Sequence, residues 1–164
     1  MRIFVVRHGD ADAEIPEGLG DEARALTAKA RQSAYAHFSH LAERMEKVDL
    51  ILTSPLVRAV QTAQILSLAQ KHEGPLRAHR SLLPDMPVGA IETVLTEHPG
   101  ENLVLVGHQP SMGAMAAHLL GLQTFPRQVN PGTVIGLDKP DDGSVPSARL
   151  LFFAAPSQAI LEAL

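Results

Sequence analysis

Two arginines and two histidines of this chain occupy positions from which they could act together on an anion. They are Arg7, His8, Arg58 and His108. All follow short apolar runs, at residues 3–6, 50–52 and 103–106, that are typical of buried strands. In an open sheet of parallel strands, ligands bind beyond the carboxyl ends of the strands. We therefore expect the four side chains to meet at one edge of such a sheet.

Phosphate is the anion that suits this cluster best. Cationic side chains repel one another, so their grouping in a chain of net charge -4 needs an anion to offset the repulsion. Planar guanidinium groups bind phosphate oxygens through paired hydrogen bonds. Helices that start after Pro55 and Pro110 would add free backbone N–H groups at the same place.

His8 is the candidate nucleophile. A neutral imidazole has a free lone pair at neutral pH, because its ordinary pKa is about 6.5. It could attack phosphorus without a metal while Arg7, Arg58 and His108 donate hydrogen bonds to the phosphoryl oxygens. Water would then hydrolyse the phosphohistidine formed on the chain.

Other chemistries fit the sequence less well. The chain has no cysteine, which excludes thiolate catalysis and disulfides. His37 and His40 share an expected helix face, but no third histidine or carboxylate stands at a matching spacing, and a catalytic zinc needs three protein ligands. We expect neither a metal nor another cofactor.

Length and composition favour one domain that works in the cytoplasm. The 164 residues are enough for a single domain with its own hydrophobic core. No run approaches the roughly 18 apolar residues of a membrane span, and the run at residues 3–6 is too short for a signal peptide. The net charge of -4 argues against nucleic-acid binding. We expect a cytoplasmic monomer that binds neither nucleic acid nor a membrane.

The periodicity of apolar residues predicts strands that alternate with helices. The expected strands are residues 3–6, 50–52, 76–79, 103–106, 133–137 and 149–154. The expected helices are residues 26–45, 55–72, 88–97, 112–120 and 159–164. Ser54 is the expected N-cap of the second helix, Gly121 the stop of the fourth, and residues 140–143 a turn between two antiparallel strands. This order predicts an α/β fold, a three-layer α/β/α sandwich whose mostly parallel central sheet has an antiparallel strand near the C-terminus.

Three local motifs resemble those of the histidine phosphatase superfamily, also called phosphoglycerate mutase-like. The motifs are Val6-Arg7-His8-Gly9, Ser54-Pro55-Leu56-Val57-Arg58-Ala59-Val60-Gln61-Thr62-Ala63 and Val104-Leu105-Val106-Gly107-His108. Their order and spacing agree with the family over about residues 1–125. The resemblance implies a phosphoglycerate mutase-like fold, phosphorylation of His8, phosphate binding by Arg58 and a second catalytic histidine at His108.

Within the superfamily, the chain is most similar to the small bacterial phosphohistidine phosphatases, which act on histidine phosphotransfer domains of signalling proteins. Gly9-Asp10-Ala11, Arg24-Ala25-Leu26-Thr27 and the compact length carry this likeness. It implies one phosphohistidine phosphatase domain over residues 1–164, with a phosphorylated protein as its partner. Gly9 and Arg24 would contact the phosphate or the substrate, although a surface position is an equally good interpretation of Arg24.

The stretch between the second and third motifs is short. Mutases and sugar phosphatases of the superfamily carry a long insertion there that supplies a glutamate as general acid. Here a helix, a strand, a helix and a strand use all of residues 59–107, so we expect no lid over the pocket. Of its carboxylates, Glu92 is expected in a solvated helix, and Asp85 is either an acid or a turn former between two prolines. An imidazole leaving group, with a pKa near 6.5, needs such an acid far less than an alkoxide does.

The preferred hypothesis is therefore a phosphatase for phosphohistidine on proteins. A phosphatase for small phosphomonoesters that uses the same mechanism stays open as an alternative. A module that binds phosphate without turnover is a second alternative, but pure binding needs donors and no nucleophile such as His8.

Overall fold

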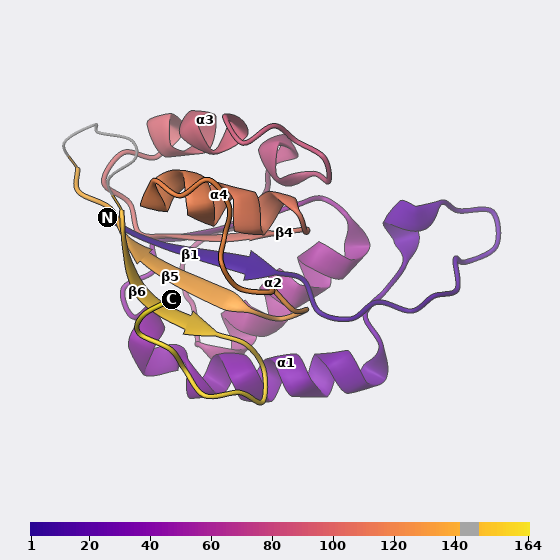
Figure 1. Ribbon diagram of the computed structural model, residues 1–164. Helices are drawn as coiled ribbons and strands as arrows, with labels where there is room; N and C mark the ends of the chain where they lie inside the picture. Colours follow the sequence, from indigo (N-terminus) through magenta and orange to yellow (C-terminus); the bar gives the residue numbers. More distant parts are fainter. Residues whose placement is uncertain (142–147) are drawn as a thin grey trace.

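The computed structural model describes residues 1–141 and 148–164 of the chain (Figure 1). In this part of the chain a six-stranded sheet has the order β3-β2-β4-β1-β5-β6. The strands are β1 (Arg2–Arg7), β2 (Leu50–Thr53), β3 (Leu76–Ala78), β4 (Leu103–Gly107), β5 (Val134–Asp138) and β6 (Arg149–Ala154). The first four are parallel to one another, whereas β5 runs antiparallel to both of its neighbours, β1 and β6.

Helices cover both faces of the sheet (Figure 1). On one face lie α1 (Ala28–His40) and α2 (Val57–Ala69), and on the other lie α3 (Ala90–Glu97) and α4 (Ser111–Leu120). The expected three-layer α/β/α sandwich, with a mostly parallel sheet and an antiparallel strand near the C-terminus, is confirmed. No helix of the described residues is long and apolar enough to cross a membrane.

The continuous apolar run of β1 follows from its place at the centre of the sandwich. Phe4 and Val6 belong to the core beneath α1 and α2, whereas Ile3 and Val5 belong to the core beneath α3 and α4. Successive strand residues point to opposite faces, so a sheet covered on both sides takes apolar residues at every position. Burial on both faces fixes β1, and with it the place where Arg7 and the residues after it emerge.

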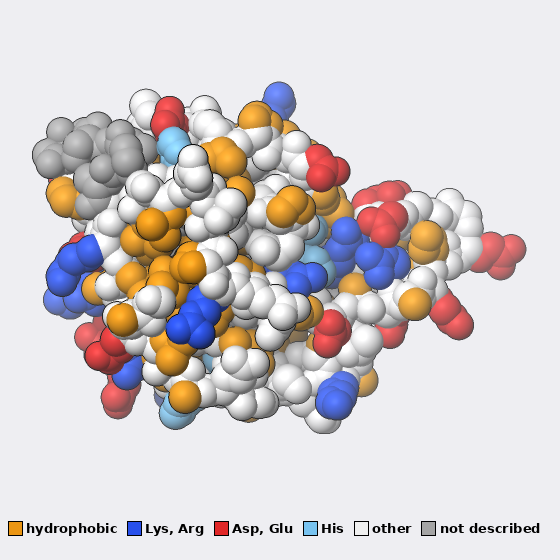
Figure 2. Space-filling view, viewed as in Figure 1, with side chains coloured by type: hydrophobic (Ala, Val, Ile, Leu, Met, Phe, Trp, Pro, Cys, Tyr) orange, Lys and Arg blue, Asp and Glu red, His pale blue; other side chains and the backbone are white. Residues whose placement is uncertain are grey.

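A projecting arm, residues 10–25, leaves the carboxyl edge of β1 (Figure 1). A bridge between Ala11 and Leu26 closes its base, and a short 3-10 turn, η1 (Asp21–Ala23), lies within it. Its six carboxylates belong to Asp10, Asp12, Glu14, Glu17, Asp21 and Glu22, and its one basic side chain is Arg24. Figure 2 shows the acidic side chains spread over the arm and basic ones where it joins the body.

The helix expected at residues 26–45 is shorter than predicted. Thr27 caps α1, because its hydroxyl accepts a hydrogen bond from the backbone N–H of Ala30 at 2.9 Å. The helix ends at His40, and a separate 3-10 turn, η2 (Ala42–Met45), follows. Periodicity alone could not separate the two pieces, since Met45 is buried in the same core as the residues of α1.

The prediction that Ser54 caps the second helix is wrong. Leu56 holds the N-cap position of α2. The backbone N–H of Ser54 instead donates to the carbonyl of Val106 at 2.8 Å, which prolongs the pairing of β2 with β4. Its hydroxyl contacts His108 in the loop after β4 and the backbone N–H of Leu56, but no N–H of the first turn of α2.

The prediction of a helix at residues 159–164 is also wrong. Leu161 exchanges two backbone hydrogen bonds with Phe153 of β6, with N···O distances of 2.7 and 2.9 Å. Partners on the edge strand thus replace the bonds that a helix would have made. At the end of α4, Gly121 does adopt the left-handed conformation expected of a helix stop, with φ at 73°. Residues 142–143 of the expected turn lie outside the described residues.

Candidate active site

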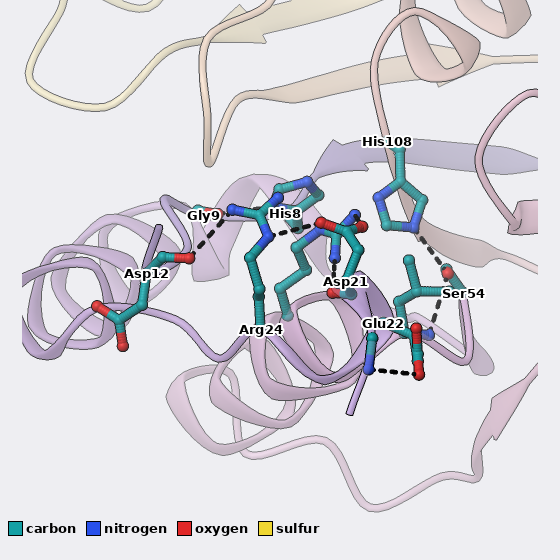
Figure 3. Close-up of polar contacts among 11 residues, drawn as sticks. His8, Gly9, Asp12, Asp21, Glu22, Arg24, Ser54 and His108 are labelled. Carbon is teal, nitrogen blue, oxygen red and sulfur yellow. Dashed lines mark hydrogen bonds and ion pairs between the residues drawn. The ribbon is translucent and has the colours of Figure 1, made fainter. Parts of the chain in front are cut away.

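The four residues singled out by their spacing meet at the carboxyl edge of the central strands. The backbone N–H of His8 donates to the carbonyl of Gly107 at 3.0 Å, which ties the end of β1 to the end of β4. The ring centroids of His8 and His108 are 5.0 Å apart (Figure 3). Arg7 ends β1, and Arg58 is the second residue of α2. The convergence of three loops from separate strands is as the sequence predicted.

His8 presents a free nitrogen to the site. Its Nδ1 lies 2.6 Å from the carbonyl oxygen of Gly9, which can only accept, so Nδ1 carries the ring proton. The pKa of His8 is lowered to about 4, and burial is the largest cause. The hydrogen bond to Gly9 raises this pKa, whereas the charges of Arg58 and Arg7 lower it. The ring is therefore neutral at neutral pH, with a lone pair on Nε2.

His108 is the more deeply buried of the two histidines, with 3% of its surface exposed. Its Nε2 lies 2.7 Å from the hydroxyl oxygen of Ser54. The pKa of His108 is lowered to about 3, chiefly by burial and also by the neighbouring His8 and Arg58. Both rings are thus neutral, although they lie beside three arginines.

The two arginines bring hydrogen-bond donors without partners into the site. Arg7 donates from one terminal nitrogen to the carbonyl of Val129 at 2.8 Å, and its Nε is buried without a partner among the described residues. Arg58 is 6% exposed, and its Nε is likewise buried and unpartnered there. Burial lowers the pKa of Arg7, yet a guanidinium group stays charged at neutral pH. Phosphoryl oxygens would satisfy these donors, whose desolvation is otherwise costly.

Asp21 is the site residue that sequence reasoning missed. Its carboxylate bridges two arginines, accepting from Arg24 Nε at 2.7 Å and from a terminal nitrogen of Arg58 at 3.1 Å (Figure 3). Its backbone carbonyl accepts from the other terminal nitrogen of Arg58 at 3.0 Å. The hydrogen bond from Arg24 and the charge of Arg58 lower the pKa of Asp21. The sequence led us to expect an acid between residues 59 and 107, whereas the acidic run of the arm was the signal that pointed to Asp21.

The expectation that residues 59–107 supply no lid stays a prediction, and the arm adds a contact that the sequence did not predict. Residues 59–107 hold most of α2, then β3, the 3-10 turn η3 (Arg80–Leu82), α3 and the whole of β4. The arm, which lies outside residues 59–107, places Asp21 within hydrogen-bond distance of Arg58. Arg24 is a partly exposed residue whose Nε is held by the Asp21 carboxylate and whose one terminal nitrogen donates to the carbonyl of Asp12 at 3.1 Å, and its contact with a phosphoryl group stays a prediction.

Gly9 and Asp85 do not offer free polar groups to the site as Arg7, His8, Arg58 and His108 do. The N–H of Gly9 donates to Thr62 Oγ1 at 3.1 Å, so this residue supports His8 through its carbonyl rather than offering its N–H to an anion. Asp85 is exposed on the loop between η3 and α3, in the left-handed region with φ at 62°. A position of this kind is typical of a turn former.

Among residues 1–141 and 148–164, no group of three or more His, Cys, Asp or Glu side chains is placed to hold a metal ion. Most of the described histidines outside the site make other polar contacts. For example, His79 and His118 pair with Glu97 and Glu92, respectively.

Known proteins resemble this chain in sequence. The histidine phosphatase superfamily (branch 1) matches residues 3–82. An uncharacterized protein of Picosynechococcus is 36% identical over 131 residues, 76% of each chain. The phosphohistidine phosphatase SixA of Escherichia coli K12 is 25% identical over 129 residues, 77% of this chain and 78% of that protein.

The likeness extends to the fold. The structure of the protein histidine phosphatase SixA complexed with tungstate superimposes with a TM-score of 0.84 at 21% identity, covering 95% of this chain and 97% of that one. With the sequence matches and the converging histidines and arginines, this chain belongs to the histidine phosphatase superfamily. It is a phosphatase, an enzyme of the hydrolase class.

The depressed pKa values of the two site histidines predict their titration. Imidazole resonances of His8 and His108, assigned with His8→Gln and His108→Gln, should keep their neutral positions from about pH 8 to about pH 5. They should then move with midpoints near 4 and 3. In the urea-unfolded chain both should titrate near about 6.5. A folded-state midpoint near that ordinary value would contradict the burial described here.

The bridging carboxylate predicts how strongly an oxyanion binds. Asp21→Asn removes a negative charge that faces the same arginines as the anion, so tungstate should bind roughly fivefold more tightly by isothermal titration calorimetry, an effect limited by solvent exposure. Asp12→Asn is the matched control, since it removes one negative charge from the same arm at a residue whose carboxylate does not pair with Arg58. Weaker binding in Asp21→Asn would mean that the carboxylate mainly holds the arginines in place.

Proposed function

We propose that this enzyme hydrolyses phosphohistidine on a protein substrate through a covalent phosphohistidine at its own His8. The observation that carries the proposal is the neutral His8 ring with its proton held on Nδ1 by Gly9, which leaves the Nε2 lone pair free beside Arg7 and Arg58. The likeness to SixA of E. coli supports the choice of phosphohistidine. The tungstate bound in the SixA structure is an analogue of the anion proposed here.

In the first step, Nε2 of His8 attacks phosphorus and the bond from phosphorus to the substrate imidazole nitrogen breaks. The phosphoryl group passes through a transition state with negative charge on its three equatorial oxygens. Arg7 and Arg58 donate N–H groups to these oxygens, and His108, whose ring lies beside that of His8, donates another. The substrate imidazole leaves and takes up a proton from solvent, which is easy for a group with a pKa near 6.5.

In the second step, a water molecule attacks the phosphorus held on His8. The bond between His8 Nε2 and phosphorus breaks, inorganic phosphate is released, and one water proton passes to solvent or phosphate. His8 returns to its neutral form, which its low pKa favours at neutral pH.

The rim of the pocket supports a protein rather than a small molecule as the carrier of the phosphoryl group. The arm beside Arg58 exposes carboxylates and two apolar side chains, Ile15 and Leu19, which are 49% and 59% exposed. A partner surface with basic and apolar residues around its phosphohistidine would complement this rim. We propose a role in signal transduction as a monomer in the cytoplasm, a reducing compartment with which the absence of cysteine is compatible.

Replacing the nucleophile tests the chemistry. His8→Ala should abolish turnover, and its circular dichroism spectrum should show an unchanged fold, because the side chain contributes chemistry rather than core packing. Wild-type protein treated with a labelled phosphodonor should form an acid-labile phosphoenzyme that the variant lacks. His40→Ala, an exposed histidine of α1, should behave as wild type. Turnover of His8→Ala within tenfold of wild type would remove His8 as nucleophile.

Asp85 distinguishes the two classes of substrate. An imidazole leaves without an acid, whereas an alkoxide without one should leave about 10² to 10⁴ times more slowly. If Asp85 acts as the acid as well as forming the turn, Asp85→Asn should keep phosphohistidine hydrolysis within a few-fold of wild type and depress any phosphomonoester activity much more. Equal losses would show that Asp85 holds its loop in place. A wild-type kcat/KM that strongly favours small phosphomonoesters would reverse the substrate assignment.

A further inference from the structure

Ser54 is fully buried beside the second site histidine, at a place fixed by the backbone. Its N–H donates to the carbonyl of Val106 at 2.8 Å, so Ser54 is held alongside the end of β4, two residues before His108. The hydroxyl oxygen lies 2.7 Å from His108 Nε2. It also accepts from the backbone N–H of Leu56 at 3.3 Å. The side chain is thus held from two directions.

The partners of the two side chains limit where their protons lie. The N–H of Leu56 can only donate, so it engages a lone pair of the Ser54 oxygen and leaves the single hydroxyl proton for another partner. The His108 nitrogen is the partner within reach. On the other side of the His108 ring, Nδ1 is buried and has no partner among the described residues. Figure 3 shows this side of the ring turned toward His8.

We propose that Ser54 is a positioning residue that donates its hydroxyl proton to Nε2 of His108 and thereby keeps the ring proton on Nδ1, facing the phosphoryl group. A neutral imidazole carries one N–H, so a ring that accepts at Nε2 must donate at Nδ1. The opposite tautomer would direct a lone pair at the phosphoryl oxygens and would leave a buried acceptor unsatisfied. The identity of the acceptor as a phosphoryl oxygen rests on the proposed function.

The proposal explains how two neutral histidines take opposite roles. Gly9 accepts from Nδ1 of His8, which turns the lone pair of Nε2 toward the site. Ser54 donates to Nε2 of His108, which turns the Nδ1–H toward the site. One ring attacks and the other donates a hydrogen bond, and no covalent bond forms or breaks at His108. Because burial keeps His108 neutral, its tautomer and not its charge decides whether it is a donor.

The tautomer can be measured without any substrate. In long-range ¹H–¹⁵N spectra of histidine-labelled protein near neutral pH, Nδ1 of His108 should resonate as a protonated nitrogen and Nε2 as an unprotonated one. In Ser54→Ala the proton should move wholly or partly to Nε2, and Ser54→Thr, which keeps a hydroxyl, should restore the wild-type pattern. A protonated Nε2 in the wild-type protein would overturn the proposal, whatever the enzyme is found to hydrolyse.

Kinetics separate positioning from a general structural role. Ser54→Ala should lower kcat/KM roughly 10- to 100-fold, less than the 10² to 10³ lost when a donor is removed altogether, as in His108→Ala. In a His108→Ala background the serine substitution should have no further effect, because its action passes through the ring. Ser81→Ala, another buried serine, should leave the rate unchanged. Additive losses from Ser54→Ala and His108→Ala would contradict the proposal.

Discussion

The pairing of β4 with both β1 and β2 is the constraint on which the site depends. Two backbone hydrogen bonds carry this pairing past the ends of the apolar runs, from His8 to Gly107 at 3.0 Å and from Ser54 to Val106 at 2.8 Å. They hold three loops in register where the strands end. These backbone hydrogen bonds therefore fix the main-chain positions of the nucleophile, the serine and the loop that carries the second histidine.

Charge is the second problem that this arrangement solves. Arg7, Arg24 and Arg58 surround two imidazoles, and protonated rings would add to the repulsion. The structure avoids this by keeping both rings neutral and by setting the Asp21 carboxylate between two of the guanidinium groups. Neutral rings are also chemically useful, since a lone pair is needed to attack phosphorus. The same desolvation thus serves stability and reactivity.

Much of the fold could be predicted from the sequence because its signals are local. The apolar runs at β1, β2 and β4 identified the buried strands, and the polar residue after each identified a loop of the site. The glycine at residue 121 marked a helix end through its backbone freedom. The family motifs include the same residues, so the strand pattern and the resemblance to the family led to the same fold and the same four site residues.

The errors arose where partners distant in the sequence decide the outcome. Ser54 precedes a proline at a helix start, which is a capping pattern, but a hydrogen bond to Val106, 52 positions later, directs it to His108 instead. Asp21 lies in an irregular segment whose path only the folded arm defines, so its contact with Arg58 had no periodic signal. Leu161 has helix-forming neighbours, yet an edge strand offered its backbone better partners. Tertiary hydrogen bonds overrode local propensity in each case.

The contact between Leu161 and Phe153 matters for the solution behaviour of the protein. An edge strand with free N–H and C=O groups is a template on which another chain can add and aggregate. At Phe153 both groups are already used by Leu161, and the opposite edge of the sheet, β3, is only three residues long. The segment after β6 therefore occupies the backbone of the edge strand at Phe153, at the point where another chain would otherwise pair with it.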